Sequence, residues 1–301
     1  MLAKIRKDWI RNSTYYLILV PVILYYLIFM YLPMGGLAIA FQNFTPSKGL
    51  FGSPWVGFDN FAAFFTSYYF GRLLGNTLFL SLLGLFFGCV CPVIFALLLN
   101  EVTNKFYKKS IQTITYMPYF ISIVVVASII KIFVTPDGPV GNIVSGLLNN
   151  PTNLLSSPEF FRPIMVISDL WQLIGYSSVV YLSALSAVDH ELYEAAVIDG
   201  AGRWKQTLHI TLPGIMPTII VILIMRTGQL LNIGFEKILL IYSPAIYSTA
   251  DIISTFVYRK GLLEANYSYA SAVGLFNSVA GLIMVLISNY LARKSSETSL
   301  F

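Results

Sequence analysis

Three long stretches of the chain, 12–47, 73–100 and 265–292, contain no charged residue. A helix needs about 20 predominantly apolar residues to cross the hydrocarbon core of a bilayer. In lipid, the backbone must satisfy its hydrogen bonds within the segment, so such stretches are expected to be helices. Only 11% of the 301 residues are charged, whereas soluble domains have about 25%. The chain is therefore predicted to be an all-α integral membrane protein.

Hydropathy and length predict six transmembrane helices in a single domain, 1–301, at about 15–40, 73–99, 111–134, 164–187, 213–235 and 269–291. A seventh apolar segment, 238–258, is interrupted by Pro244 and Asp251. We expect it to be an outer loop that packs on the protein. Segments 46–61 and 135–163 are rich in turn-forming residues and are also expected to be outer loops.

Basic residues are unevenly distributed around these spans. Because Lys and Arg near span ends favour the cytoplasm, both termini and the loop 188–212 are expected to be cytoplasmic. Eleven basic residues lie on this side and six on the other: Lys4, Arg6, Lys7, Arg11, Lys105, Lys108, Lys109, Arg203, Lys205, Arg293 and Lys294, against Lys48, Arg72, Arg162, Lys237, Arg259 and Lys260.

Resident metal and nucleotide sites have no signature in the sequence. Cys89 and Cys91 lie in one apolar run and are interpreted as packing residues, with neither disulfide nor metal-site spacing. The chain contains no G-x-x-x-x-G-K-[ST] phosphate-binding loop. We therefore expect no cofactor in this chain, and any ATP hydrolysis must come from separate subunits.

A polar segment separates the fourth and fifth spans. Asp189 can cap a helix start by accepting a hydrogen bond from a free backbone N–H, and Gly200 allows the chain to turn. A second short helix would place Trp204 and Leu208 on one face, and Pro213 would begin the fifth membrane helix. The pattern predicts two short cytoplasmic helices at a right-angled turn.

This predicted helix pair has two interpretations. Small side chains at Ala195 and Ala196 permit close backbone approach, so a compact charged element of this kind suits insertion into a groove on another protein. The alternative is a solvated loop that only joins two spans. The pattern alone does not choose between them.

The same segment resembles the EAA motif of the permease subunits of binding-protein-dependent ABC importers. Every position of that pattern is matched, by Glu194, Ala195, Ala196, Gly200, Ile210, Leu212 and Pro213. Four longer stretches are similar to the branch that imports complex oligosaccharides, including aldouronates: YLPMGGLAIAFQNF (31–44), MPYFIS (117–122), ELYEAAVIDGAGRWKQTLHITLPGI (191–215) and YSYASAVGLFNSVAGLIMVLISNYLA (267–292).

The resemblance implies the fold of a type I ABC importer permease, with 189–212 as its coupling segment. Glu194 would make a polar docking contact with an ATPase, and Gly200 would make the turn. The implied partners are a second homologous permease, two ATPase subunits that bind ATP and Mg²⁺, an extracytoplasmic solute-binding protein, an oligosaccharide and the lipid of a prokaryotic cell membrane, with no nucleic acid. The implied coupling residues are Glu194, Ala195, Ala196, Asp199, Gly200, Arg203, Ile210, Leu212 and Pro213.

Polar residues within the spans are candidates for a substrate path, because ionisable groups in a bilayer are costly unless they have a role. Arg226, Gln229, Asn232 and Glu236 are spaced by three, three and four residues. This spacing predicts that the four side chains share one side of the fifth helix. The alternatives are polar contacts with a partner permease and, for the aromatic residues, packing. The candidates are Asp169, Trp171, Gln172, Tyr176, Arg226, Gln229, Asn232, Glu236 and Asn277.

Three functions are compatible with a polar path through such a membrane protein. The first is a non-enzymatic permease subunit that moves an oligosaccharide by alternating access, powered by ATPases. The second is an ion-coupled secondary transporter using Asp169, Arg226 and Glu236, which leaves 189–212 without a partner. The third is a membrane-embedded enzyme with Asp169 and Glu236 as acid and base, which no nucleophile or metal motif supports. We expect the first.

Overall fold

The computed structural model describes residues 2–148, 150, 153–228, 230–232 and 234–295, with side chains described outside 2–10, 232 and 291–295. Within these residues the regular structure is helical, apart from one isolated bridge between Gln42 and Trp55. Six stretches are long and apolar enough to cross a membrane, which confirms the all-α prediction: Arg11–Phe41, Phe70–Asn100, Ile123–Leu148, Pro158–Ser186, Arg203–Thr227 and Tyr267–Tyr290.

The chain divides into two units, each made of two chain segments. The first, Met1–Thr66 with Arg259–Leu275, contains α1 (Leu2–Tyr26), a π-helical turn (Leu27–Tyr31), α2 (Leu32–Met34), a 3-10 helix (Gly35–Phe41), α3 (Gly49–Gly52), α4 (Asp59–Phe65), a second π-helical turn (Arg259–Leu263) and the start of α16 (Tyr267–Ser295). The second, Ser67–Tyr258 with Phe276–Phe301, contains α5 (Phe70–Asn100), α6 (Lys105–Tyr116), α7 (Ile123–Val134), α8 (Pro139–Leu148), α9 (Pro158–Ser186), α10 (His190–Ile198), α11 (Arg203–Gln206), α12 (Leu212–Thr227), α13 (Phe235–Ile241), α14 (Tyr247–Ala250), α15 (Ile253–Tyr258) and the rest of α16.

In the first unit, the segment after the N-terminal span is an ordered loop that carries α3 and α4. The Asn43 N–H donates to the Pro54 carbonyl at 2.8 Å, and the Asn60 side-chain amide donates to the Ala40 and Gln42 carbonyls at 2.9 and 3.1 Å. These bonds satisfy backbone groups where the helix ends, which a membrane interface requires.

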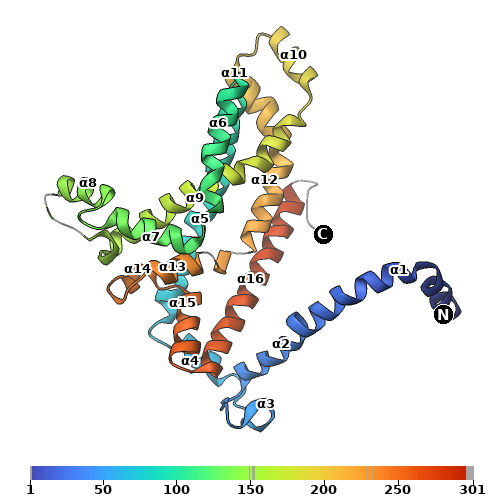
Figure 1. Cartoon of the computed structure of the whole chain (residues 1–301), viewed down its shortest axis with the longest axis vertical. Coiled ribbons are helices and arrows are strands. Elements are labelled where there is room, and N and C mark those ends of the chain that lie inside the picture. The colour runs from blue at the N-terminus through green and yellow to red at the C-terminus, as the bar shows by residue number, and fades with distance from the viewer. Residues whose placement is uncertain (1, 149, 151–152, 229, 233, 296–301) are drawn as a thin grey trace. The chain divides into compact units, whose positions relative to one another are not determined.

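In the second unit, α5 and α9 lie along each other, and α6 and α12 pack against α9 (Figure 1). Buried side chains from three of these helices meet between them: Val93 and Ala96 from α5, Tyr181 and Leu185 from α9, and Ile215 from α12. Small residues such as Ala96 let the helix backbones approach closely. This group of helices is the frame on which the candidate sites are built.

The prediction that the third span, 111–134, forms a single helix is wrong. The α6 helix ends at Tyr116, a 3-10 turn follows, and α7 begins at Ile123 in a different direction (Figure 1). Pro118 cannot donate to a helix ladder and clashes with the preceding turn. Ser122 is extended, and its Oγ accepts from the Val125 N–H at 3.4 Å, so it caps a new helix.

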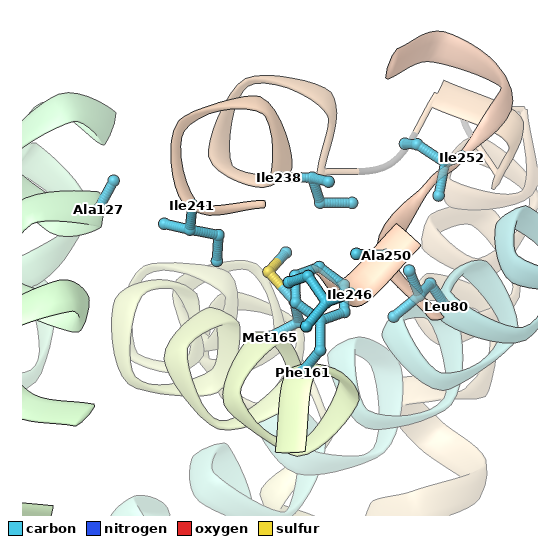
Figure 2. Packing of buried hydrophobic residues seen from close by; sticks show 9 residues of the cluster. All are labelled: Leu80, Ala127, Phe161, Met165, Ile238, Ile241, Ile246, Ala250 and Ile252. Carbon is cyan, nitrogen blue, oxygen red and sulfur yellow. The ribbon is translucent and has the colours of Figure 1, made fainter. Parts of the chain in front are cut away.

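The apolar segment 238–258 does not form a seventh span. It folds into α13, α14 and α15 and buries its isoleucines against α5, α7 and α9, which confirms the predicted packing on the protein. Figure 2 shows this cluster, in which Met165 and Phe161 of α9 face side chains from α13 and from the chain on either side of α14. Its members are Leu80, Ala127, Phe161, Met165, Ile238, Ile241, Ile246, Ala250 and Ile252.

Buried polar groups fix the same segment to α5 and α9. The Asn76 side-chain amide donates to the Ser248 and Asp251 carbonyls at 3.0 and 3.1 Å, and Arg162 donates to Asn76 at 3.1 Å. Asp251, fully buried, forms an ion pair with Arg72 at 3.4 Å. Because a buried polar group is stable only when its hydrogen bonds are made, this network specifies one position for α14.

The fifth span ends earlier than predicted. The α12 helix stops at Thr227, a 3-10 turn covers Leu230–Asn232, and α13 starts after Gly234, whose φ is 69°. Free carbonyls of the turn are satisfied from other helices: Ser81 donates to the Leu230 carbonyl, and Asn277 donates to the Leu231 carbonyl at 3.3 Å. Side chains of α5 and α16 thus stabilise a break that lipid alone would not tolerate.

The Asp251–Arg72 pair gives a stability test. Asp251→Ala is expected to lower the free energy of unfolding by about 3 kcal/mol, because Arg72 is left largely buried without its partner. Thermal unfolding of the detergent-solubilised protein measures the loss. Glu264→Ala is the control, since its ion pair with Lys260 is partly exposed and is worth less than about 1 kcal/mol. Equal destabilisation by both variants would contradict the assigned role of the buried network.

Candidate functional site: a charged cavity and an exposed helical segment

A cavity of about 730 Å³ lies within the second unit, between α5, α9, α12, α13 and the 3-10 turn that follows α6. This volume is within the usual range of ligand sites, about 300–1,000 Å³. The wall is mainly apolar, with a few converging polar side chains: Tyr119, Asp169, Gln172, Ser177, Arg226, Glu236 and Lys237. Apolar walls with few polar groups are typical of sites that bind small organic ligands.

One face of α9 supplies the polar side of the cavity. Asp169, Gln172 and Ser177 of α9 all line the cavity, and Asp169 and Gln172, three residues apart, lie on the same side of the helix. Trp171 is 44% exposed and is not among the lining residues. Tyr176 also lies outside the lining, but its ring stacks on that of Tyr119 with 3.7 Å between centroids, and Tyr119 does line the cavity.

The acidic and basic groups of the cavity fall into two sets. Lys237 of α13 is 3% exposed and forms an ion pair with Asp169 of α9, with Ser168 at 3.4 Å from the same ammonium. Removing an ion from water costs several kcal/mol unless a partner compensates it. The pair therefore neutralises two of the four cavity charges and ties α13 to α9, whereas Arg226 and Glu236 belong to no ion pair among the described residues.

The prediction that Arg226, Gln229, Asn232 and Glu236 share one side of the fifth helix is wrong. Arg226 is in the last turn of α12, whereas Glu236 is in the first turn of α13, beyond the break at Gly234. Helical periodicity does not continue through a break, so the two side chains reach the cavity from different helices. Gln229 lies outside the described residues, as does the side chain of Asn232.

Asn277 has a different position from the one predicted. It is 6% exposed, its amide donates to the Leu231 carbonyl, and it is not among the residues that line the cavity. It lies beside the cavity and supports the 3-10 turn that forms part of the wall. Of the predicted path residues, the cavity therefore brings together Asp169, Gln172, Arg226 and Glu236.

Sequence reasoning missed Lys237 and Tyr119. Lys237 was counted as an outer basic residue, because the fifth span was expected to end before it. Its position directly after Glu236 within an apolar run is the signal that could have placed it in the membrane. Tyr119 lies in the stretch MPYFIS, in which Pro118 indicates a helix break that exposes neighbouring side chains.

The segment between α9 and α12 begins as predicted. The Asp189 carboxylate accepts from the Glu191 N–H at 3.0 Å and caps α10. The helix ends at Ile198, and Gly200, two residues later, has a φ of 73° in the left-handed region. The Gly200 N–H donates to the Val197 carbonyl and the Ala201 N–H to the Ala196 carbonyl, at 3.0 and 2.8 Å, which is the hydrogen-bond pattern of a Schellman motif.

The predicted second short helix is not separate from the fifth span. Helical structure is continuous from Arg203 through a π-helical turn, Thr207–Thr211, to Thr227. Pro213 lies within this continuous helix, just after the π-helical turn and in the first turn of α12, where its missing N–H is tolerated. The Tyr193 hydroxyl donates to the Thr211 Oγ1 at 3.0 Å, so α10 is joined to the π-helical turn.

The residues implied as coupling residues differ in exposure. Glu194, Ala195, Asp199, Gly200, Arg203 and Pro213 are exposed, whereas Ala196, Ile210 and Leu212 are half-buried. Arg203 forms an exposed ion pair with Glu101, at the end of α5, at 3.2 Å. In Figure 1, α10 lies at one end of the group formed by α5, α6, α9 and α12, and α13, α14 and α15 lie toward the other end.

Metal-ligand side chains do not cluster in the residues that the structure describes. Within that part of the chain, no group of three or more His, Cys, Asp or Glu side chains is arranged to hold a metal ion. The charged groups of the cavity are too few and too closely paired for such a site.

Six helices that are long and apolar enough to cross a membrane, together with a cavity in the second unit that carries polar side chains, are typical of a multi-pass membrane transport protein. Residues 88–297 match the family described as "Binding-protein-dependent transport system inner membrane component". The chain belongs to this family and is the permease component of an ABC importer. Family members are transport components rather than enzymes, and nothing in this membership supports the ion-coupled alternative.

Similar proteins cover nearly the whole chain. The protein LplB of Bacillus subtilis is 46% identical over 292 residues, which are 97% of this chain and 92% of LplB. The polygalacturonan/rhamnogalacturonan transport system permease protein YteP of the same species is 41% identical over 293 residues, 97% of this chain and 91% of YteP.

A crystal structure of a bacterial ABC transporter that imports the acidic polysaccharide alginate matches with a TM-score of 0.90 and 45% identity, over 97% of this chain and 99% of that chain. A second structure, of the bacterial alginate transporter in complex with an alginate pentasaccharide-bound periplasmic protein, also has a TM-score of 0.90, at 44% identity over 98% and 99% of the two chains.

The Lys237–Asp169 pair predicts asymmetric effects of substitution. Asp169→Leu is expected to reduce the free energy of unfolding by about 3 kcal/mol, because it leaves a buried ammonium without a partner. Lys237→Met should cost less, since Asp169 is 32% exposed and solvent can reach it. The double variant should recover much of the loss caused by Asp169→Leu alone. Unfolding measurements that give additive losses would show that the two side chains do not interact.

Gly200 and Gly202 form a matched pair for testing the end of α10. Gly200→Ala is expected to cost about 1–2 kcal/mol locally, because its φ is left-handed. Gly202 has a φ of −70° and open space around it, so Gly202→Ala should have no such effect. Hydrogen exchange of the α10 amides should accelerate in the first variant only. The same acceleration in both would contradict the geometry assigned to the turn.

Proposed function

We propose that the two units work together as one permease domain, which is half of the membrane pathway of an ATP-driven oligosaccharide importer. The cavity is the translocation path, and 189–212 is the coupling segment. The partners are a second homologous permease, two ATPase subunits that bind ATP and Mg²⁺, and an extracytoplasmic solute-binding protein. Substrate movement follows alternating access, driven by the ATPases.

The observation that carries the coupling role is the surface of α10. Val197 and Ile198 are 64% and 86% exposed, and Glu194, three and four residues before them and so on the same side of α10, is exposed without a hydrogen bond or ion pair among the described residues. Exposed apolar side chains gathered around a polar group are typical of a protein–protein contact. A loop that only joined two spans would not need them, so the docking interpretation is favoured over the solvated loop.

The continuous helix from Arg203 to Thr227 supports the same proposal. It has 25 residues and is therefore about 37 Å long. One end is joined to α10 through the hydrogen bond between Tyr193 and Thr211, and the other end carries Arg226 into the cavity. A displacement of α10 by an ATPase would reach the cavity through this helix.

The size and chemistry of the cavity support an oligosaccharide as substrate. Tyr119 offers an aromatic surface, and amide, hydroxyl and charged groups offer hydrogen bonds to sugar hydroxyls. The similar protein YteP is named for polygalacturonan/rhamnogalacturonan transport, and the similar alginate transporter is involved in the import of an acidic polysaccharide. The excess of basic residues around 189–212 supports a cytoplasmic position for this segment and for both termini.

Glu194→Ala tests the coupling proposal. Uptake of oligosaccharide by the assembled importer should fall, and less ATPase should co-purify with the permease, because the variant removes the polar docking contact. Glu159→Ala is the matched control, since Glu159 is an exposed carboxylate in the first turn of α9. The coupling assignment is wrong if Glu194→Ala transports and assembles normally, or if uptake proceeds without ATP hydrolysis.

A further inference from the structure

Arg226 is a guanidinium in the cavity wall without a carboxylate partner. Its Nη2 donates to the Ser177 Oγ at 3.0 Å, and no acidic group of the described residues lies within 4.0 Å. It belongs to a membrane-spanning helix, where an ionised group is costly unless it faces protein partners or water. Lys237, by contrast, has its charge compensated by Asp169.

The neighbouring helix is shaped to hold this guanidinium. A Cβ at Gly88 would lie 2.4 Å from the Arg226 Nη1 and 3.5 Å from its Cζ. Any other residue at position 88 would therefore displace the side chain. Gly88 of α5 and Ser177 of α9 together fix the position of Arg226 from two helices, which a group that only extended into water would not need.

A fixed guanidinium that faces a cavity has a preferred ligand. Its planar donors match the two oxygens of a carboxylate, and charge-assisted hydrogen bonds of this kind are about twice as strong as neutral ones. Glu236, the other cavity charge outside the ion pair, is exposed and can accept hydrogen bonds from sugar hydroxyls. Arg226 attracts an anion in the cavity, whereas Glu236 repels it, so the anion is held less tightly than by Arg226 alone. A translocation site must release what it binds.

We propose that Arg226 is the specificity-determining residue through which this cavity prefers saccharides that carry a carboxylate over neutral ones. The proposal rests on the importer function proposed above and adds the charge of the substrate and the residue that recognises it. Lys237 takes no part in this recognition, because Asp169 already neutralises it.

The test uses the complete importer in proteoliposomes and two saccharides of equal length, an oligouronide and its methyl ester, which differ only in charge. Each uptake rate is divided by the rate of the unsubstituted importer for the same saccharide, so the contribution of the binding protein cancels. Arg226→Gln should reduce uptake of the acid by about tenfold or more, since a hydrogen bond to a charged group is lost, and should reduce uptake of the ester much less, because the Gln amide can still bond to sugar hydroxyls. Arg226→Lys should retain part of the acid uptake, because the charge remains without the planar fork.

Gly88→Ala displaces the guanidinium without changing any charge, and it should also reduce acid uptake selectively. Lys131→Gln, which removes a positive charge from the exposed face of α7, is the control and should change neither rate. Co-purification of the partner subunits verifies assembly of each variant.

Equal losses for the acid and the ester in Arg226→Gln, or normal acid uptake in that variant, would overturn the proposal. If the unsubstituted importer moves only the ester, the proposal is also wrong, although the importer function stands. If the unsubstituted importer moves only the acid, the two Arg226 variants decide the proposal. Equal losses of acid uptake in Arg226→Lys and Arg226→Gln overturn the proposal, and a smaller loss in Arg226→Lys supports it. If it moves no saccharide in the presence of ATP, the importer function itself fails, and this inference fails with it.

Discussion

The need to satisfy every backbone group inside a bilayer determines how this chain can build a polar cavity. An uninterrupted helix would hide all its carbonyls and leave no place for α13 to turn into the protein. The chain instead breaks the fifth span near Gly234 and supplies donors from Ser81 and Asn277. The break is thus stabilised from two other helices, and it brings Arg226 and Glu236 into the cavity from different directions.

Charge compensation organises that cavity. Lys237 and Asp169 neutralise each other and tie two helices together, so they contribute to the wall. Arg226, held by Ser177 and accommodated by Gly88, has no such partner among the described residues. The division between a structural pair and a ligand-facing group cannot be deduced from charge alone, because all of these residues are ionisable groups within apolar sequence.

Much of the fold was predictable because lipid imposes simple rules on length and charge. Hydropathy and length correctly indicated six membrane-spanning helices, and Pro244 and Asp251 correctly argued against a seventh span. The breaks were harder to predict. Pro118 and Gly234 interrupt apolar sequence that hydropathy treats as continuous, and only tertiary contacts decide whether such a residue is accommodated or ends the helix. The prediction that Arg226 and Glu236 share one side of the fifth helix failed for this reason, since it extended one helical period across the break at Gly234.

The continuous helix between Arg203 and Thr227 has a consequence for the energetics of the transport cycle. Arg203 and Arg226 belong to the same continuous helical stretch, so a rotation of that stretch as a whole would carry Arg226 with it. The distances from the Arg226 guanidinium to Ser177 and Gly88 would then change whenever an ATPase moved this helix. Affinity for the cargo would alternate with the orientation of the permease, and release would need no separate device.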